Sequence, residues 1–261
     1  MRSLSIAATG MLAQQLNVEV ISNNIANMNT TSYKRQRAEF QDLLYQSQRR
    51  VGSTSSDTGT IVPAGIQLGL GVRTAAVYRM HGQGNMTLTD NTLDMAVQGR
   101  GYFQVLLPSG ETAYTRAGSF QLSPNGEIVT ADGYTVQPAI TIQPDALDVT
   151  INTSGEVLVK IAGQVSPSTV GQFQLATFPN ETGLEAIGQN MLVETPASGT
   201  PTSSTPGSTG FGTILQGFLE TSNVDVVSEI TNLITAQRAY EMNSKVIETS
   251  DQMLQTVSNL R

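Results

Sequence analysis

Apolar residues occupy every seventh position near the beginning of the chain, a spacing typical of a helix with one narrow apolar stripe. The stripe consists of Leu4, Met11, Val18 and Ile25, and Ala7 and Ile21 follow two of these residues by three positions. The other faces carry mainly small and amide side chains, and Glu19 is the single charged residue between Arg2 and Tyr33. We therefore predict that residues 1–46 form an N-terminal helical segment.

The end of the chain repeats this pattern. Its apolar stripe consists of Val226, Leu233, Tyr240, Ile247 and Leu254. Ser222, followed three positions later by Asp225, is typical of a capping box, in which side chains satisfy the backbone N–H groups of a first helical turn. We assign residues 213–261 to a C-terminal helix that joins the N-terminal one.

The two terminal helices allow two arrangements. Each helix could pack separately on the middle of the chain, or the two could pack together as a coiled coil that neighbouring copies of the protein complete. The second arrangement is favoured because each apolar stripe is narrow. The remaining faces are also neutral and rich in amides, whereas the exposed faces of solvated helices are usually charged.

Residues 66–195 follow a different pattern, in which apolar and polar residues alternate as they do in half-buried strands. Three tight turns carry Gly at the third position, which supplies the left-handed backbone conformation of a hairpin turn. These turns are residues 108–111, 124–127 and 153–156. No helical stretches separate the strands, so we predict a central antiparallel β domain and an α+β fold.

Two polar stretches lie between the β domain and the terminal segments. Residues 47–65 are rich in Ser, Thr and Gly, and residues 196–212 are rich in Ser, Thr, Pro and Gly. Composition alone favours disorder for such stretches, because they cannot bury enough apolar surface to offset the entropy of ordering. We predict a polar extended stretch at 47–65 and a linker at 196–212.

Composition excludes several classes of function. The chain of 261 residues has 21 acidic against 14 basic residues, a net charge of −7 that argues against a general nucleic-acid binder. It contains no Cys and a single His, His81, so disulfides, thiolate nucleophiles and Cys/His zinc sites are excluded. No apolar run is long enough to span a membrane. The glycine pairs do not continue into a nucleotide-binding motif, and no nucleophile elbow accompanies His81. We predict a protein that is not an enzyme, with no cofactor and no metal site.

Basic residues cluster after the first predicted helix and are interleaved with Tyr33, Phe40 and Tyr45. The cluster consists of Lys34, Arg35, Arg37, Arg49 and Arg50. It could be an RNA-binding arm, but an electrostatic contact with an acidic neighbouring copy of the same chain is favoured.

Several motifs resemble those of the bacterial flagellar rod and hook proteins, and they cover essentially the whole chain. Near the N-terminus the resemblance lies in Ser22-Asn23-Asn24-Ile25-Ala26-Asn27, followed by Thr30, Tyr33 and Lys34. Near the C-terminus it lies in residues 220–224 and 237–243, and in the middle in residues 99–103 and 114–120. Residues 42–46, a polar stretch and residues 65–69 resemble the branch of the family that builds the distal rod. One departure is Ser32, which stands where many members carry Gly.

The resemblance implies a structural axial subunit of the flagellar basal body. Such a subunit polymerises into the helical tube of the distal rod, which crosses the periplasm, transmits torque and encloses the export channel. The implied partners are copies of the chain, neighbouring rod and hook proteins, the surrounding ring proteins and the flagellar type III export apparatus, without nucleic acid or a membrane span. The terminal helices would pack with those of neighbouring copies and would be disordered before assembly.

The resemblance also gives a role to particular residues. It implies an assembly interface that includes both apolar stripes together with Asn23, Asn24, Asn27, Tyr33 and Lys34. It further implies that the stretch containing Gln46, Arg49, Arg50 and Pro63 is ordered against neighbouring subunits and distinguishes the straight rod from the flexible hook. Two alternatives remain: a proximal rod paralogue of the same family, and an extracellular β-rich adhesin or binding module.

Overall fold

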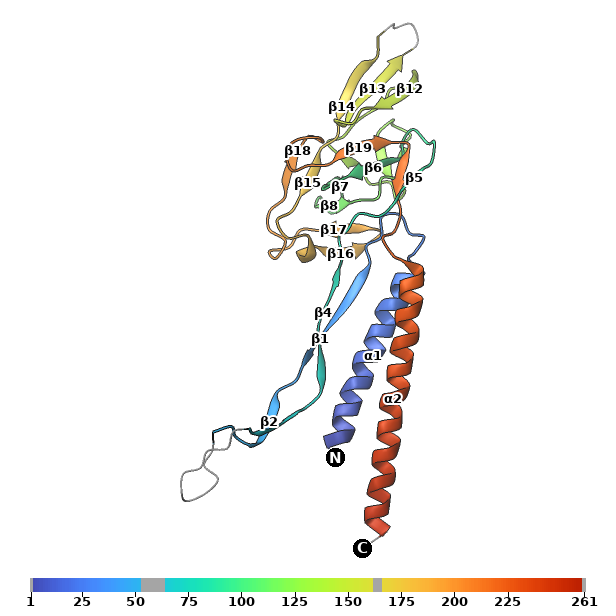
Figure 1. The fold of residues 1–261 in the computed structure, drawn as a ribbon. Coiled ribbons are helices and arrows are strands. Elements are labelled where there is room, and N and C mark those ends of the chain that lie inside the picture. Colours follow the sequence, from blue (N-terminus) through green and yellow to red (C-terminus); the bar gives the residue numbers. More distant parts are fainter. Residues whose placement is uncertain (1, 53–63, 162–165, 260–261) are drawn as a thin grey trace. The chain divides into compact units, whose positions relative to one another are not determined.

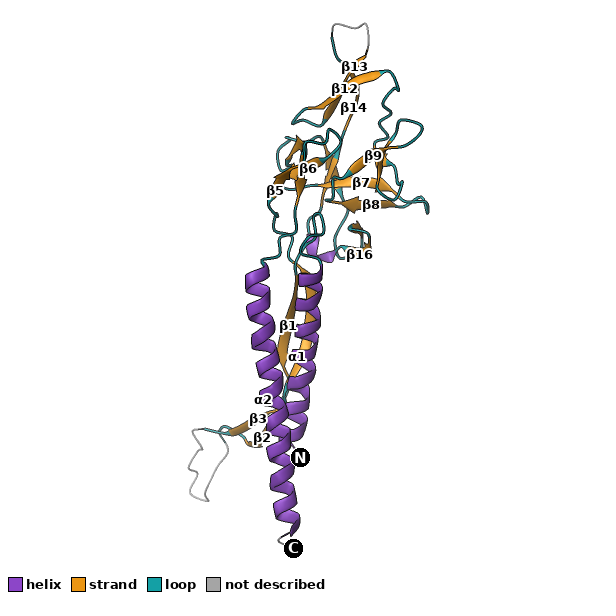
Figure 2. Cartoon of the chain, turned by 90° about the vertical axis from the view of Figure 1, so that its right-hand side faces the viewer, coloured by secondary structure: helices purple, strands orange, loops and turns teal. Residues whose placement is uncertain are grey.

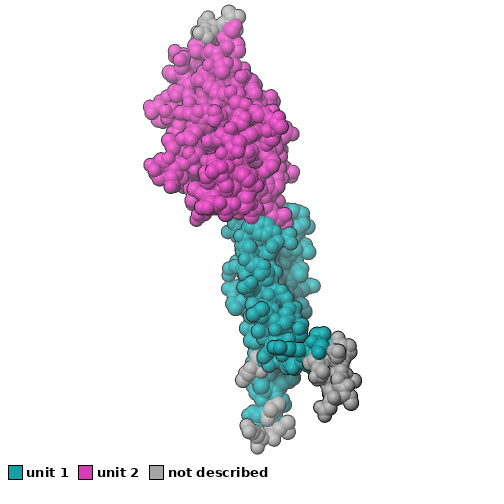
Figure 3. Space-filling model, turned by 90° about the vertical axis from the view of Figure 1, so that its left-hand side faces the viewer, with its two compact units in different colours: residues 1–26, 36–78, 225–261 teal, residues 27–35, 79–224 magenta. Residues whose placement is uncertain are grey.

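The computed structural model describes residues 2–52, 64–161 and 166–259. The chain divides into two compact units, coloured separately in Figure 3. Unit 1 comprises residues 1–26, 36–78 and 225–261, and unit 2 comprises residues 27–35 and 79–224. Each unit is therefore built from segments that lie far apart in the sequence, and both ends of the chain contribute to unit 1.

Unit 1 contains two helices, α1 (Arg2–Ala26) and α2 (Val226–Asn259), which lie side by side and run in opposite directions (Figures 1 and 2). The side chains buried in α1 are mainly small, with Ala7 and Ala13 among them. A Cβ atom added to Gly10 would lie 2.9 Å from Nδ2 of Asn243 on α2. Small residues at these positions therefore let the two helices approach closely. Within the described residues, neither helix is long and apolar enough to cross a membrane.

The residue that caps the start of α2 is Asp225, not the predicted Ser222. The Asp225 Oδ1 atom accepts a hydrogen bond from the Val227 N–H at 3.1 Å, and its Oδ2 atom accepts one from the Ser228 hydroxyl at 2.7 Å. The Ser222 hydroxyl instead accepts the Val224 N–H at 3.3 Å, before the helix starts. The predicted cap therefore lies three residues too early, because Asp225 is the residue that precedes the first helical position, Val226.

Unit 1 also contains two pairs of antiparallel strands. Strand β1 (Gln36–Asp42) pairs with β4 (Val72–Arg79), and β2 (Tyr45–Arg49) pairs with β3 (Ile66–Gly69). The N-terminal helical segment predicted for residues 1–46 therefore ends early, at Ala26. The Asn, Thr and Ser residues at 27–32 compete for backbone hydrogen bonds and favour a turn over a helix.

Unit 2 is built on a seven-stranded antiparallel sheet in which β11 lies off the main strand order β16-β17-β8-β7-β15-β18. Its members are β7 (Tyr102–Leu106), β8 (Thr112–Thr115), β11 (Val136–Gln137), β15 (Leu175–Thr177), β16 (Glu185–Gly188), β17 (Met191–Val193) and β18 (Thr202–Ser204). A short 3-10 helix spans Glu181–Gly183.

Smaller antiparallel sheets complete unit 2. A three-stranded sheet has the order β12 (Ala146–Ile151), β13 (Glu156–Ile161) and β14 (Ser168–Gln172). Three strand pairs join β9 (Phe120–Leu122) to β10 (Ile128–Thr130), β19 (Thr213–Gln216) to β6 (Met95–Gln98), and β20 (Phe218–Glu220) to β5 (Met86–Leu88). The predicted hairpin turns are confirmed: Gly110, Gly126 and Gly155 have φ of 87°, 81° and 78°.

The core of unit 2 is aliphatic and aromatic. Phe103, Phe120 and Phe173 pack against one another with ring centroids 5.2 to 6.4 Å apart. A second, smaller cluster surrounds Phe178 and Tyr114, whose rings meet edge to face at 4.8 Å. The antiparallel β architecture predicted for the middle of the chain is therefore present, and its core lies inside unit 2.

Three predicted boundaries differ from the structure. Strands β3 and β4 fall within residues 66–195 but belong to unit 1. Residues 196–212 are not a disordered linker, because β18 pairs with β15 and Ser198 and Pro206 are buried. Residues 213–220 are strands instead of helix, because Ile214 enters the apolar core and Gly217, at φ 77°, separates the two strands. Of the stretch 47–65, residues 53–63, including Pro63, lie outside the described part of the chain.

Candidate assembly surfaces and the buried ion cluster

The predicted apolar stripes contribute unequally to the packing of α1 against α2. On α1, Ala7 and Ile21 are buried, while the four residues at seven-residue spacing are partly exposed, as are three of the five on α2. Tyr240 and Leu254 remain exposed, with 45% and 38% of their surface accessible. The partly exposed residues are Leu4, Met11, Val18, Ile25, Val226, Leu233 and Ile247. The stripes are thus only partly covered within one copy of the chain.

Helix α2 has a second set of exposed apolar side chains, which lies outside the predicted stripe of Val226, Leu233, Tyr240, Ile247 and Leu254. Val227, Ile230 and Ile234 follow one another at helical intervals and are 75%, 45% and 45% exposed. Met242 and Met253 are exposed further along the same helix. Spacings of three, four and seven residues were the signal available in the sequence. This surface, which we call the outer α2 stripe, is not covered within the described residues of one chain.

A groove of about 360 Å³ lies between the two helices. Val18 and Tyr240, both predicted as interface residues, line it together with the acidic residues Glu19 and Glu241. The remaining lining residues are the amides Gln15 and Gln237, so the groove offers apolar, amide and carboxylate groups to a side chain from another molecule. The groove therefore places two of the predicted residues on an accessible surface.

The asparagine-rich motif at the end of α1 mainly organises its own unit. Asn24 is 1% exposed, and its side-chain amide exchanges two hydrogen bonds with the Gln36 backbone, each of 2.8 Å. It also donates to Glu229 Oε2 on α2 at 3.2 Å. Asn24 therefore holds α1, β1 and α2 together. Asn23 is exposed and Asn27 partly exposed, and the Thr30 hydroxyl donates to Asn27 Oδ1 at 3.1 Å.

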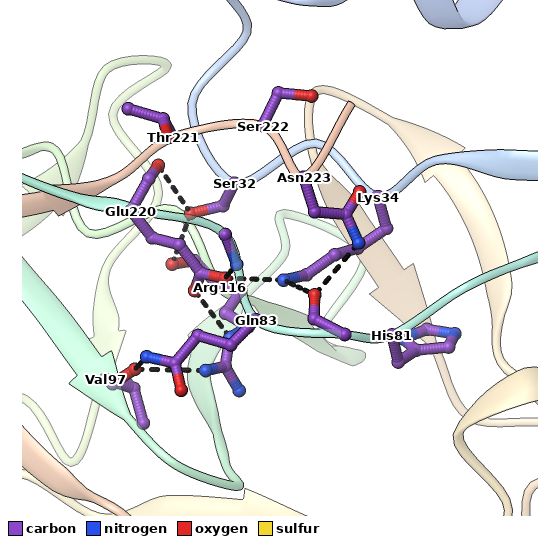
Figure 4. A network of polar contacts seen from close by, with 12 residues as sticks. Ser32, Lys34, His81, Gln83, Val97, Arg116, Glu220, Thr221, Ser222 and Asn223 are labelled. Atoms are coloured by element: carbon purple, nitrogen blue, oxygen red, sulfur yellow. Dashed lines mark hydrogen bonds and ion pairs between the residues drawn. The ribbon is translucent and has the colours of Figure 1, made fainter. Parts of the chain in front are cut away.

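Unit 2 contains three buried, ionised side chains in contact, Lys34, Arg116 and Glu220, which we call the ion cluster (Figure 4). The Glu220 side chain is fully buried and forms ion pairs with Lys34 at 2.5 Å and with Arg116 at 2.6 Å. The Gly84 N–H donates a third hydrogen bond to this carboxylate at 2.7 Å. Lys34 is therefore a partner of Glu220 inside its own unit, and 6% of its surface is exposed. Tyr33 beside it is partly exposed.

The cluster also holds backbone carbonyls in place. The Arg116 guanidinium donates to the carbonyl oxygens of Gly101, Val97 and Gly99 at 3.1, 3.0 and 2.7 Å. The Lys34 ammonium donates to the Gly82 carbonyl at 2.9 Å. Buried charges are tolerated where every group is paired in this way. The ion cluster thus joins the segments around residues 34, 84, 116 and 220.

Burial and pairing shift the pKa values of these groups in a consistent way. Burial alone raises the pKa of the Glu220 carboxyl, but the charges of Arg116 and Lys34 outweigh it, so this pKa lies below its usual value. Burial lowers the pKa of the Lys34 ammonium, and Glu220 opposes that effect only in part. Glu220 is therefore ionised at neutral pH.

Ser32, which stands where the resemblance predicts Gly, adopts a conformation that glycine favours. Its φ is 56°, in the left-handed region. Its hydroxyl donates to the Arg116 carbonyl at 2.9 Å, and its N–H donates to the Glu220 carbonyl at 2.8 Å. These bonds offset the cost of a side chain in this conformation, so the turn forms without glycine.

His81 packs against Tyr102 and is hydrogen-bonded to it. Its Nδ1 atom lies 2.8 Å from the Tyr102 hydroxyl, which also donates to Glu181 Oε2 at 3.4 Å. Burial lowers the pKa of His81 and raises that of Tyr102. Among the described residues, no group of three or more His, Cys, Asp or Glu side chains could hold a metal ion.

The residues predicted to be specific to the rod lie on and beside the β2–β3 pair. Gln46, Arg49 and Arg50 are all exposed. Strand β2 is exposed along its whole length, and Ile66 and Leu68 on β3 are 49% and 43% exposed. This pair is a second surface without a covering element in the described chain. Pro63 lies outside the described residues.

Three family descriptions match different parts of the chain. "Flagella basal body rod protein" matches residues 4–34, "Flagellar hook protein FlgE/F/G D1 domain" matches residues 96–159, and "Flagellar basal body rod FlgEFG protein C-terminal" matches residues 215–260. These ranges include both helices and much of unit 2.

Curated relatives match over the full length of the chain. A flagellar basal-body rod protein FlgG of Caulobacter vibrioides is 65% identical over 261 residues, covering 100% of both chains. The FlgG of Agrobacterium fabrum is 53% identical over 258 residues, covering 99% of this chain and 98% of the relative. The FlgG of Bacillus subtilis is 39% identical over 267 residues, covering 100% of this chain and 99% of the relative.

Proposed function

The chain belongs to the FlgG family of flagellar basal-body rod proteins, and from this membership we propose that it polymerises into the helical tube of the distal rod. It is a structural protein of the basal-body rod, not an enzyme. Assembly with copies of itself and with neighbouring rod and hook proteins follows from this role. The binding-module alternative receives no support from relatives that match from end to end.

The observation that carries the proposal is the outer α2 stripe. Val227, Ile230 and Ile234 are exposed apolar residues on one helix, which is costly for a protein that remains a monomer. Burying an apolar side chain of this size contributes about 1.5–3 kcal/mol. We propose that α1 and α2 form a coiled coil whose open surfaces, this stripe and the groove at Val18 and Tyr240, are covered by the helices of adjacent copies.

A tube of this kind gains rigidity from repetition. The same set of contacts is repeated between every copy and its neighbours. Many interfaces of moderate strength therefore resist torque together. We propose that part of the neutral helix surface lines the export channel. The neutral side chains of Ser22 and Asn23 on α1 support this, because both are exposed and carry no charge or apolar surface that would hold passing cargo.

The β2–β3 pair is proposed to stiffen the rod. Its exposed residues would pack on adjacent copies and restrict the bending that a hook permits. Deletion of residues 47–62 tests this: we expect curved or flexible rods in electron micrographs of purified basal bodies. Rods as straight as those of the parent would contradict the role. The ring proteins and the type III export apparatus are proposed as further partners, on the family resemblance alone.

Cysteine cross-linking tests the assembly surface cleanly, because the natural chain has no cysteine. We expect the double variant Val227→Cys with Ile234→Cys to give a ladder of cross-linked copies when rods are treated with a bifunctional thiol reagent. The control is Ala236→Cys with Ala13→Cys, since both positions are buried within the helix pair. A ladder from the control, or none from the outer α2 stripe, would contradict the proposed packing.

A further inference from the structure

Unit 2 contains a cavity of about 220 Å³ beside the ion cluster. It lies between the segment at residues 32–34 and the hairpin formed by β16 and β17, and its lining includes Lys34, Arg79, Arg116, Gln189 and Asn190. A water molecule occupies about 30 Å³ in the liquid, so the space holds roughly seven waters or one acidic side chain with part of its hydration shell. Three of these lining residues are cationic.

The charges around the cavity do not balance. Lys34 and Arg116 share the single carboxylate of Glu220. Glu181 also acts on Lys34, but it is paired with Arg100 at 3.2 Å. The described residues that line the cavity include three cationic side chains, Lys34, Arg79 and Arg116, and no carboxylate. The local excess of positive charge stands out in a chain whose net charge is −7, and it favours an anionic ligand.

The cationic groups retain hydrogen-bonding capacity. An ammonium group has three N–H donors and a guanidinium has five. Lys34 uses two donors, toward Gly82 and Glu220, and Arg116 uses four, toward Glu220, Gly101, Val97 and Gly99. One N–H of each side chain therefore has no acceptor among the described residues. Lys34 and Arg116 are 6% and 7% exposed, and both line the cavity.

The rim of the cavity is fixed before any ligand arrives. Gln189 and Asn190 form the hairpin turn with φ of 54° and 59°. The Asn190 amide donates to the Thr31 carbonyl at 3.1 Å, and its own carbonyl accepts the Thr115 hydroxyl at 2.9 Å. A preformed site loses little entropy when a ligand binds.

We propose that this cavity binds a carboxylate side chain supplied by an adjacent copy of the chain in the rod. The inference rests on the proposed function, because polymerisation holds the carboxylates of one copy close to another copy at very high effective concentration. A carboxylate there would accept charge-assisted hydrogen bonds from Arg79 and the ion cluster. It would also reduce the repulsion between copies that each carry a charge of −7.

Arg79 provides the test, because it lines the cavity, is partly exposed and lies outside the ion cluster. We expect Arg79→Glu to reduce the yield of assembled rods at least tenfold in cells that lack the natural copy, with Arg79→Gln less affected and Arg79→Lys least. The matched control is Lys160→Glu, an exposed charge reversal on β13, which should assemble like the parent. Monomer melting temperatures should agree within about 2 °C, as expected for surface substitutions.

Three results would overturn the proposal. Equal loss of assembly in Arg79→Glu and Lys160→Glu would show that only total charge matters. Normal assembly of Arg79→Glu would show that the cavity is not an interface, while the rod function would stand. Saturable binding of acetate to the monomer, seen as chemical-shift changes at the Asn190 amide and unaltered by assembly, would assign the cavity to a small free anion. If the parent itself formed no rods, the proposed function would fail instead.

Discussion

Glu220 connects parts of the chain that are distant in sequence. Its carboxylate binds Lys34, which is 186 residues away, and Arg116, which is 104 residues away, and both ions are almost inaccessible to water. Removing one partner of such a buried pair leaves a charge without compensation and typically costs about 3–5 kcal/mol. At the scale of single residues, this carboxylate joins three segments of unit 2 that lie far apart in the sequence.

The ion cluster makes the stability of unit 2 sensitive to acid. The pKa of Glu220 is lower in the folded state than in the unfolded state. The ionised carboxylate therefore contributes fully to the free energy of unfolding above the unfolded pKa, and this contribution is lost as the pH falls through the folded pKa. We expect the free energy of unfolding in urea to drop between about pH 4 and the folded pKa. Glu220→Gln should be several kcal/mol less stable at pH 7 and should lose much of this dependence.

A matched carboxylate provides the control for that experiment. Glu111 lies in an exposed turn, so Glu111→Gln should unfold with the stability and the acid dependence of the parent. If Glu220→Gln kept the full acid dependence, the groups responsible would lie elsewhere in the chain.

The residues of the ion cluster could be picked out in the sequence, but the ion pairs between them could not. Lys34, Arg116 and Glu220 all lie in the motifs that identified the family. Nothing in a linear pattern pairs a lysine with a glutamate 186 residues later. The same limit applies to Ser32: its departure from glycine was visible, but the hydroxyl bond to Arg116 that makes the turn possible depends on the tertiary structure.

At the scale of elements, periodicity located both helices but not their ends. Seven-residue spacing marks α1 and α2 because apolar contacts repeat along a helix pair. It did not show that α1 ends at Ala26, since the boundary depends on the turn-forming residues that follow. The stretch 196–212 was predicted as a linker because Ser and Thr are common in disorder, yet β18 is a polar edge strand that gains its order from pairing with β15.

The start of α2 yields a prediction at this scale. Asp225 accepts the Val227 N–H and the Ser228 hydroxyl, so Asp225→Ala should destabilise the helix by about 1 kcal/mol. Thermal unfolding followed by far-ultraviolet circular dichroism would measure the loss of helical signal. Asp225→Asn keeps the acceptor and should lose much less. Equal effects of the two substitutions would contradict a capping role.

At the scale of the whole molecule, the two units differ in what stabilises them. Unit 2 has a core containing Phe103, Phe120 and Phe173, and it has the buried ion cluster. In unit 1 the buried apolar residues are mostly small, and the large apolar side chains of α2 are exposed. Unit 2 therefore has the means to fold within one chain, whereas much of the apolar surface of unit 1 is left for other copies to cover.

This difference predicts unequal protection from hydrogen exchange. In the dilute monomer, we expect amides of α1 and α2 to exchange with opening free energies of about 0–2 kcal/mol, near the fraying limit, because helices are marginal without tertiary burial. Amides of β7, β8 and β15 should exchange only through global unfolding of unit 2. Assembly into rods should then slow exchange in α1 and α2 by orders of magnitude. Amides of β7 and β8 should change little, since the central sheet of unit 2 is already complete within one copy. Mass spectrometry of pepsin fragments would measure both states.

Monomer helices protected as strongly as the central sheet would mean that one copy already completes the helix pair. Polymerisation would then have to be driven by another surface.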